Sequence, residues 1–194
     1  MKDSAIRSAF HKSVLKYAHE DKNTIVVDEL GIKNGEIRAD IAVLNGKLIG
    51  YEIKSEKDTL TRLTPQVIAY SEVFEKSYLI AADKHIVKAS QIVPDSWGIY
   101  TIRKSENFNL EFCCEREATQ SETRNSFSIA QLLWKSEASN ILIELFDYKI
   151  KSNHTRQHLY NVLAETCTIH ELSEIVLKYL KLREGWRTNH KQLL

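Results

Sequence analysis

The chain has 194 residues, 43% hydrophobic and 27% charged, which is typical of a globular protein and excludes wholesale disorder. Its 27 Lys and Arg against 26 Asp and Glu give a net charge of +1, so no overall basic field indicates a nucleic-acid partner, although a local basic cleft fits this balance. Three cysteines without a C-x-x-C pair argue against a zinc site and a disulfide framework. Because neither a signal peptide nor a membrane-spanning run is found, we expect a cytoplasmic protein without a membrane partner.

The first hundred residues predict alternating helices and strands. Apolar residues from Ala5 to Ala18 recur at helical spacing, with Asp3 or Ser4 as an available N-cap. Asn45-Gly46 between two β-branched runs is a strong hairpin signal. The predicted elements are a helix over 4–19, strands over 24–30, 37–44 and 48–54, a helix from Thr64-Pro65 to about Lys76, a strand over 78–82, a helix over 83–90 and a strand over 97–102. The spacing of the second of these helices predicts that it buries Val67, Tyr70 and Phe74.

This order predicts the fold class. A three-stranded meander followed by a βαβ crossover gives a mixed sheet with helices on both faces, an α/β (α+β) architecture. After it, we expect a connector with a candidate strand over 108–113, and then helices over 127–147, 154–166 and 168–183, the last begun by a Thr168/Glu171 capping box. The predicted organisation is a core over 1–104, a connector over 105–126 and a C-terminal helical subdomain over 127–194.

The turn of the hairpin decides which side chains share a face. A two-residue turn would place Asp40 and Glu52 on opposite faces, each of mixed polarity. A three-residue loop over 44–46, with its glycine in the left-handed conformation, instead pairs Asp40 with Gly50 and gives one continuous apolar face. We therefore predict the second register, with open space beside Asp40. The apolar face then carries Ile37, Ala39, Ile41, Val43, Ile49, Tyr51 and Ile53, and the polar face Arg38, Asp40, Glu52 and Lys54.

Two carboxylates beside a lysine have a chemical use. Asp40 and Glu52 would supply the hard oxygen ligands that Mg²⁺ prefers, and the ion keeps waters and accepts a phosphate oxygen. Such a metal lowers the pKa of a bound water and offsets the charge that develops on a phosphate during hydrolysis. Lys54 beside it can orient or deprotonate the attacking water. The cluster would add little to folding stability, since buried ion pairs often stabilise a protein no more than apolar packing does.

These residues also resemble a known motif. Asp40, eleven intervening residues and Glu52-Ile53-Lys54 at the end of the next strand resemble the core motif of the PD-(D/E)XK nuclease superfamily. The segment RADIAVLNGKLIGYEIKSEKDTLTRLTPQVIAYSEVF resembles a branch of small, poorly characterised bacterial and phage proteins within it. The resemblance covers about residues 1–104 and implies a restriction-endonuclease-like core, metal ligation by Asp40 and Glu52, and a catalytic Lys54. Ala39 departs from the pattern, because the superfamily usually has Pro before the Asp.

The resemblance further implies residues that support the site. The superfamily often adds an upstream acid as a metal ligand, which Glu29 matches best and Glu20 less well, although Glu29 could equally be the polar end of a buried strand. Gln66 would face the metal or the scissile phosphate from the start of the second helix. Lys57 is a further candidate for binding backbone phosphates. The branch resembles this chain also at Arg38, Asp58, Arg62, Gln66 and Tyr70, of which Arg38 and Arg62 are expected nucleic-acid contacts.

The sequence thus predicts a nuclease that uses Mg²⁺ or Mn²⁺ to hydrolyse DNA, with RNA also open. A catalytically silent nuclease-fold module that binds nucleic acid or a protein, for instance in phage–host conflict, is the alternative. A third interpretation makes Asp40, Glu52 and Lys54 a solvated face with ordinary salt bridges. The last two predicted helices could form a helix-turn-helix motif that binds DNA. The apolar stripe of 168–183 instead favours packing of the last helix on the core or in a dimer surface. A homodimer would suit an enzyme that cuts both DNA strands.

Overall fold

A mixed β-sheet forms the centre of the computed structural model, which describes residues 2–105, 107 and 109–183. Its strands are β1 (Ile25–Ile32), β2 (Ile37–Leu44), β3 (Leu48–Lys54), β4 (Lys76–Ala82), β5 (Gly98–Lys104) and β6 (Leu110–Arg116). They lie side by side in this order. β1 to β3 form an antiparallel meander, β3 to β5 are parallel, and β6 pairs antiparallel with β5. The mixed α/β class predicted from the order of elements is confirmed.

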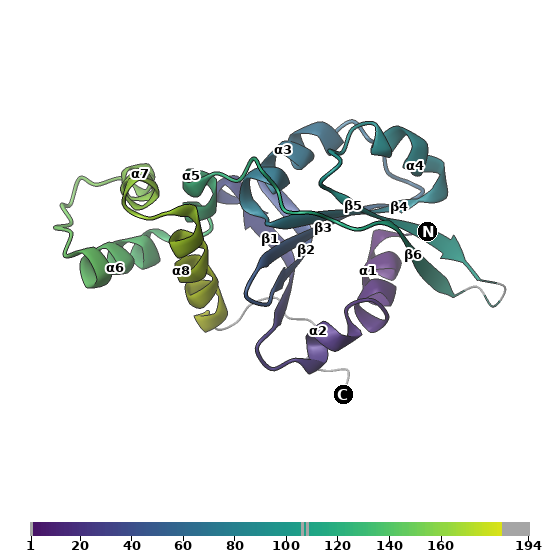
Figure 1. Cartoon of the computed structure of the whole chain (residues 1–194), viewed down its shortest axis with the longest axis horizontal. Coiled ribbons are helices and arrows are strands. Elements are labelled where there is room, and N and C mark those ends of the chain that lie inside the picture. The colour runs from purple at the N-terminus through teal and green to yellow at the C-terminus, as the bar shows by residue number, and fades with distance from the viewer. Residues whose placement is uncertain (1, 106, 108, 184–194) are drawn as a thin grey trace.

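Helices cover both faces of the sheet and continue beyond it. They are α1 (Asp3–Lys12), α2 (Lys16–Glu20), the 3-10 turn η1 (Lys33–Gly35), α3 (Leu63–Val73), α4 (Asp83–Ser90), α5 (Ser126–Ala130), α6 (Lys135–Phe146), α7 (Arg156–Thr166) and α8 (Ile169–Leu182). In Figure 1, α3 and α4 lie over one face of the sheet and α1 lies against the other, while α5 to α8 gather at one end of the molecule. Among the described residues, no helix combines the length and the apolar character that crossing a membrane requires.

Each face of the sheet has its own hydrophobic core. On the face covered by α3, the buried residues include Leu63, Tyr70 and Trp97, and this core continues into the C-terminal helices α5 to α8. On the opposite face, Ile6 and Phe10 of α1 pack against apolar residues of β2 to β4. The C-terminal helices therefore share a core with the sheet. Residues 184–194 of the predicted C-terminal subdomain lie outside the described residues.

The first helix differs most from its prediction, because two helices replace the single one expected over 4–19. The amide of Leu15 donates to the carbonyl of Phe10, five residues back, at 3.1 Å, which interrupts the helical hydrogen-bonding pattern. This turn buries Leu15 in the core and leaves Tyr17, predicted to belong to the apolar stripe, 78% exposed. The N-cap is Lys2, without a side-chain cap, rather than Asp3 or Ser4.

Other boundaries move by a few residues. The helix expected over 127–147 is interrupted between α5 and α6, where Leu132 and Leu133 turn into the core and the amide of Trp134 donates to Glu137 at 2.6 Å to begin α6. α3 begins at Leu63, so Thr64-Pro65 lies inside its first turn rather than at its cap. The candidate strand over 108–113 is β6, and its residue 108 lies outside the described residues. The predicted Thr168/Glu171 capping box is confirmed.

The hairpin between β2 and β3 has a register two residues away from the predicted one. Leu44 pairs with Leu48, so the loop consists of 45–47 rather than 44–46, and Gly46 has the expected positive φ of 90°. Ala42, not Asp40, therefore lies opposite Gly50. A shift of two residues does not change which of the paired side chains share a face. The missing side chain of Gly50 makes room for Phe74, since a Cβ there would lie 2.5 Å from its Cδ2.

The predicted apolar face is also wrong at one end of β2. Ile37 and Ala39 pack in the core under α3, whereas Ile41 packs in the opposite core under α1. The side-chain alternation reverses at Asp40, where pairing with β1 skips the Glu29–Asp40 position and Glu29 has a φ of 57°. A left-handed glutamate is uncommon and strained, and such residues gather at functional sites. This irregularity lies where the sequence predicts the metal ligands.

Candidate metal centre and active site

Glu52 lies at the centre of the candidate site and is 1% exposed. It shares a side of β3 with Lys54, because alternate residues of a strand point the same way. The ammonium group of Lys54 donates to Oε1 of Glu52 and, at 2.9 Å, to Oε1 of Gln66 from α3. The hydroxyl of Tyr70, also from α3, donates to Oε2 of Glu52 at 2.6 Å. Two residues of one strand and two of one helix thus meet in a buried polar cluster.

Asp40 joins this cluster from the neighbouring strand. Its Oδ2 accepts from the amide of Ile53 at 2.7 Å, and its own amide donates to the Tyr70 hydroxyl at 3.1 Å. Burial, and after it the negative charge of Glu52, raises the pKa of Asp40 from 3.8 to about 8. The Ile53 amide and Arg7 pull that pKa down but do not offset these effects. Part of this shift comes from repulsion between the two carboxylates, which a bound cation would relieve.

Tyr70 positions both acids and is itself fixed as a donor. It is completely buried, and burial together with the charges of Glu52 and Asp40 raises its pKa well above 10. The phenol therefore keeps its proton and directs it at Glu52, the shortest of its contacts. The sequence predicted Tyr70 as a core residue with Val67 and Phe74, which is confirmed, but gave no indication of this hydrogen-bonding role.

Arg7 of α1 enters the site from the opposite side and was missed by the sequence argument. Its Nη2 lies 2.6 Å from Glu29, 3.2 Å from Asp3 and 3.4 Å from Asp40. Its Nε is buried and has no hydrogen-bond partner within the described part of the chain. The available signal was weak: an arginine four residues after Asp3 predicts an ordinary i, i+4 pair on a helix surface.

The other predicted residues lie outside this cluster. Glu29 pairs with Arg7, and its other carboxylate oxygen lies 3.9 Å from Arg38 at the rim. Lys57 and Arg62 are exposed, and neither takes part in an ion pair within residues 2–105. Of the residues singled out by the sequence, the structure brings these into one cluster: Asp40, Glu52, Lys54, Gln66 and Tyr70. Asp58 supports the cluster indirectly, because its carboxylate accepts from the Ser55 amide at 2.7 Å and fixes the loop after β3.

The ligands present suit a hydrated magnesium ion rather than a complete protein cage. Within the described residues, no three His, Cys, Asp or Glu side chains converge as a ready-made metal site. Asp40 and Glu52 are two carboxylates close enough for the charge of one to raise the pKa of the other. Mg²⁺ commonly binds through one or two carboxylates and fills its other positions with waters and substrate phosphate oxygens. The oxygens of Glu52 keep further lone pairs beside their bonds to Lys54 and Tyr70.

Comparison with known proteins identifies relatives in phages. The family described as Bacteriophage P4 protein cII matches residues 5–194. Protein cII of Enterobacteria phage P4 is 30% identical over 159 residues, which make up 81% of this chain and 59% of the phage protein. The chain thus spans less than two thirds of that relative's length.

Two solved structures are similar at low sequence identity. The SPO1766 protein of unknown function from Silicibacter pomeroyi is 11% identical with a TM-score of 0.45, over 79% of this chain and 98% of that one. SfsA of Pyrococcus furiosus in complex with Ca²⁺ is 14% identical with a TM-score of 0.36, over 58% of this chain and 62% of that one.

Proposed function

We propose that this chain, which belongs to the family of bacteriophage P4 protein cII, is a metal-dependent nuclease of the PD-(D/E)XK superfamily that hydrolyses phosphodiester bonds of DNA. One observation carries the proposal: Asp40, Glu52 and Lys54 lie together with Gln66 in one polar cluster beside the core under α3. Two acids and an amine in this arrangement support phosphodiester hydrolysis better than they support stability.

In this proposal Asp40 and Glu52 hold Mg²⁺, which supplies positive charge to the phosphate and lowers the pKa of a bound water. Tyr70 and the Ile53 amide each occupy one oxygen of these carboxylates and so fix the directions of the remaining lone pairs. Lys54 is held between Glu52 and Gln66. Its ammonium group is thereby placed to orient the attacking water and to stabilise charge on the phosphate.

Arg7 acts as the internal counter-ion of the site. It contacts Asp40, a proposed metal ligand, and Glu29, which the resemblance implies as a further one, so it neutralises both acids when no metal is bound. We expect Arg7→Gln to bind Mg²⁺ roughly tenfold more tightly than Arg7→Lys, because it removes a like charge that opposes the ion. Titration calorimetry of the two variants measures the difference. Weaker binding by Arg7→Gln would show instead that Arg7 positions the carboxylates.

The experiment that tests the function combines metal binding with cleavage. Purified protein is incubated with plasmid and linear DNA in Mg²⁺ or Mn²⁺, and Mg²⁺ binding is measured by calorimetry. Glu52→Gln is expected to lose both metal binding and cleavage. Glu165→Gln removes an exposed glutamate of α7 and should keep both. A Glu52→Gln protein that cuts DNA as fast as the wild type would end the proposal, and cleavage of RNA alone would change its substrate.

A silent nuclease-fold module is the second candidate function. It is favoured by the internal pairing of the acids, because Lys54 already contacts Glu52 and Arg7 already contacts Asp40. Such a module would bind nucleic acid or a protein without metal. Tight DNA binding in EDTA that Glu52→Gln leaves unchanged, together with no cleavage by the wild type, would support this candidate over the enzyme.

A further inference from the structure

The carboxyl ends of the three parallel strands meet at one edge of the sheet, beside the candidate site. Lys54 at the end of β3 pairs with Ala81 of β4, and Ala82 pairs with Ile102 of β5. The end of β5 is therefore two strand spacings, about 10 Å, from the end of β3. In open α/β sheets, ligands bind outside this edge of the strands. Any substrate on Lys54 would have its neighbouring groups close to the ends of β4 and β5.

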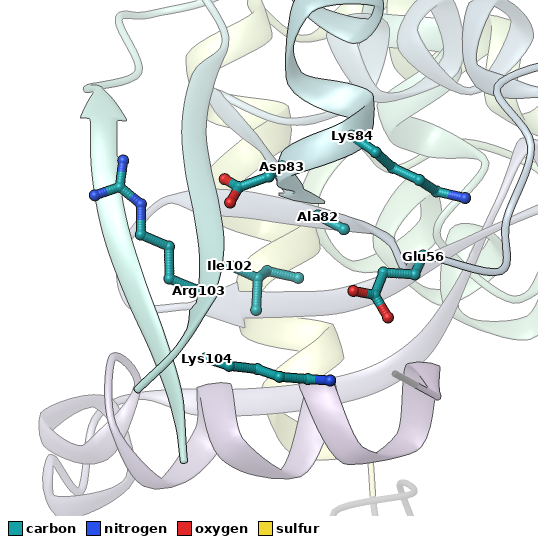
Figure 2. A pocket seen from close by; sticks show the side chains of 7 residues that line it. All are labelled: Glu56, Ala82, Asp83, Lys84, Ile102, Arg103 and Lys104. Carbon is teal, nitrogen blue, oxygen red and sulfur yellow. The ribbon is translucent and has the colours of Figure 1, made fainter. Parts of the chain in front are cut away.

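A pocket of about 570 Å³ opens at this edge. Ala82 and Ile102 contribute its apolar lining, and charged side chains from three segments surround it (Figure 2). Its volume lies within the range of about 300–1,000 Å³ that is typical of ligand sites. The pocket is tied to the candidate site by His85 of α4, whose Nε2 donates to the carbonyl of Ser55, directly after Lys54, at 3.1 Å.

The cations around the pocket differ in their internal partners. Arg103 lies 3.3 Å from Glu115 of β6 and is thus partly neutralised. Lys84 and Lys104, by contrast, form no ion pair within the described ranges of the chain. In the view of Figure 2, Glu56 lies between these two lysines. Both lysines are exposed and interact electrostatically with Glu56, and their ammonium groups remain within reach of a ligand in the pocket.

We propose that this pocket binds a backbone phosphate of the substrate strand near the one being cut, through Lys84 and Lys104. The inference rests on the proposed nuclease function and adds a binding site to it. The ends of β3 and β5 are only about 10 Å apart, so a phosphate in the pocket would belong to a nucleotide close to the scissile one. Lysines bind backbone phosphates as point charges and independently of sequence.

This assignment also explains how a nearly neutral chain can hold a polyanion. The net charge of +1 gives no long-range attraction, so the positive charge has to lie where the backbone passes. Glu56 and Asp83 lie among the cations and keep the patch small. Contact with a single phosphate, rather than with an extended stretch of duplex, follows from this mixed charge.

The test is the salt dependence of DNA binding by the Lys84→Gln/Lys104→Gln double variant. Affinity for a fluorescent single-stranded oligonucleotide is measured by anisotropy in EDTA, so that no cleavage occurs. Each lost phosphate contact should reduce the slope of log K against log salt by about 0.7. Because the two lysines share one phosphate, we expect a reduction of about 0.7 and a tenfold or greater loss of affinity at low salt. In Mg²⁺, KM should rise while kcat stays near the wild-type value.

Lys88→Gln is the matched control, because Lys88 is exposed on the same helix one turn after Lys84 and does not line the pocket. It should keep the wild-type slope. A double variant that binds like the wild type, or an equal loss in Lys88→Gln, would overturn the pocket while leaving the nuclease proposal intact. Wild-type protein that neither binds nor cuts nucleic acid would overturn both. Unchanged thermal unfolding of the double variant shows that the losses do not come from misfolding.

Discussion

Replacing Lys54 with methionine is expected to slow DNA cleavage by about 10² to 10³-fold at saturating substrate. The ammonium group is buried, contacts Glu52 and Gln66, and is the cation that the proposed mechanism places on the developing phosphate charge. Removing one preorganised charge-stabilising group from an active site has effects of about this size, equivalent to roughly 3–4 kcal/mol. Single-turnover cleavage in Mg²⁺ measures the rate of the chemical step.

Two further variants keep this prediction interpretable. Lys54→Met leaves Glu52 buried without its partner, which can reduce stability by about 3–5 kcal/mol. Lys54→Arg keeps the charge and so should keep the fold, but its guanidinium cannot be deprotonated and has a different shape, so cleavage should still be slow. Lys47→Met, in the exposed hairpin loop, should cut at the wild-type rate. Full activity in both Lys54 variants would remove this residue from the mechanism.

Replacing Asp40 with asparagine is expected to stabilise the metal-free protein at neutral and alkaline pH. The pKa of Asp40 is raised to about 8 by burial and by the charge of Glu52. Between about pH 4 and pH 8 the folded protein thus holds a proton that the unfolded chain has released, so the free energy of unfolding falls as pH rises. Asparagine carries no charge and still offers an oxygen to the Ile53 amide. We expect a gain of at least about 2 kcal/mol at pH 8.

Urea unfolding between pH 4.5 and 8.5 in EDTA measures this effect. The two proteins should be similar in stability near pH 4.5 and diverge as pH rises, with a flatter profile for Asp40→Asn. Saturating Mg²⁺ should stabilise the wild type and leave the variant unaffected, because binding to the folded state alone raises stability. Parallel pH profiles would show that the charge of Asp40 is already balanced in the folded protein, contrary to the expectation.

The hairpin shows how far the sequence could predict the site. β2 and β3 have the predicted bounds, because β-branched runs and Asn45-Gly46 determine strands and turn locally. Loops over 44–46 and over 45–47 both place Gly46 in its left-handed conformation, so local turn chemistry does not separate them. The two registers differ by two residues, and side-chain parity survives that shift. The prediction thus brought Asp40 and Glu52 together although its exact pairing was wrong.

Other features depend on contacts that no local pattern encodes. The reversal of alternation at Asp40 accompanies the left-handed Glu29 on a different strand, whereas the prediction assumed an uninterrupted period of two. Arg7 reaches Asp40 across 33 positions of the chain, which helix periodicity cannot reveal. Tyr70 was placed in the core because of its spacing, and its hydroxyl contact with Glu52 follows only from the way α3 lies on the sheet.

The close approach of Phe74 to Gly50 carries a consequence for the evolution of this family. The Phe74 ring packs beside that of Tyr70, with 5.1 Å between their centroids, and Tyr70 in turn holds Glu52. Even a methyl group at residue 50 would displace this aromatic pair. The requirement for glycine at residue 50 is steric and does not depend on catalysis. Homologues that lack the acids and are inactive should therefore still have glycine at this position. Homologues without this glycine should instead pack the helix that corresponds to α3 differently on the sheet.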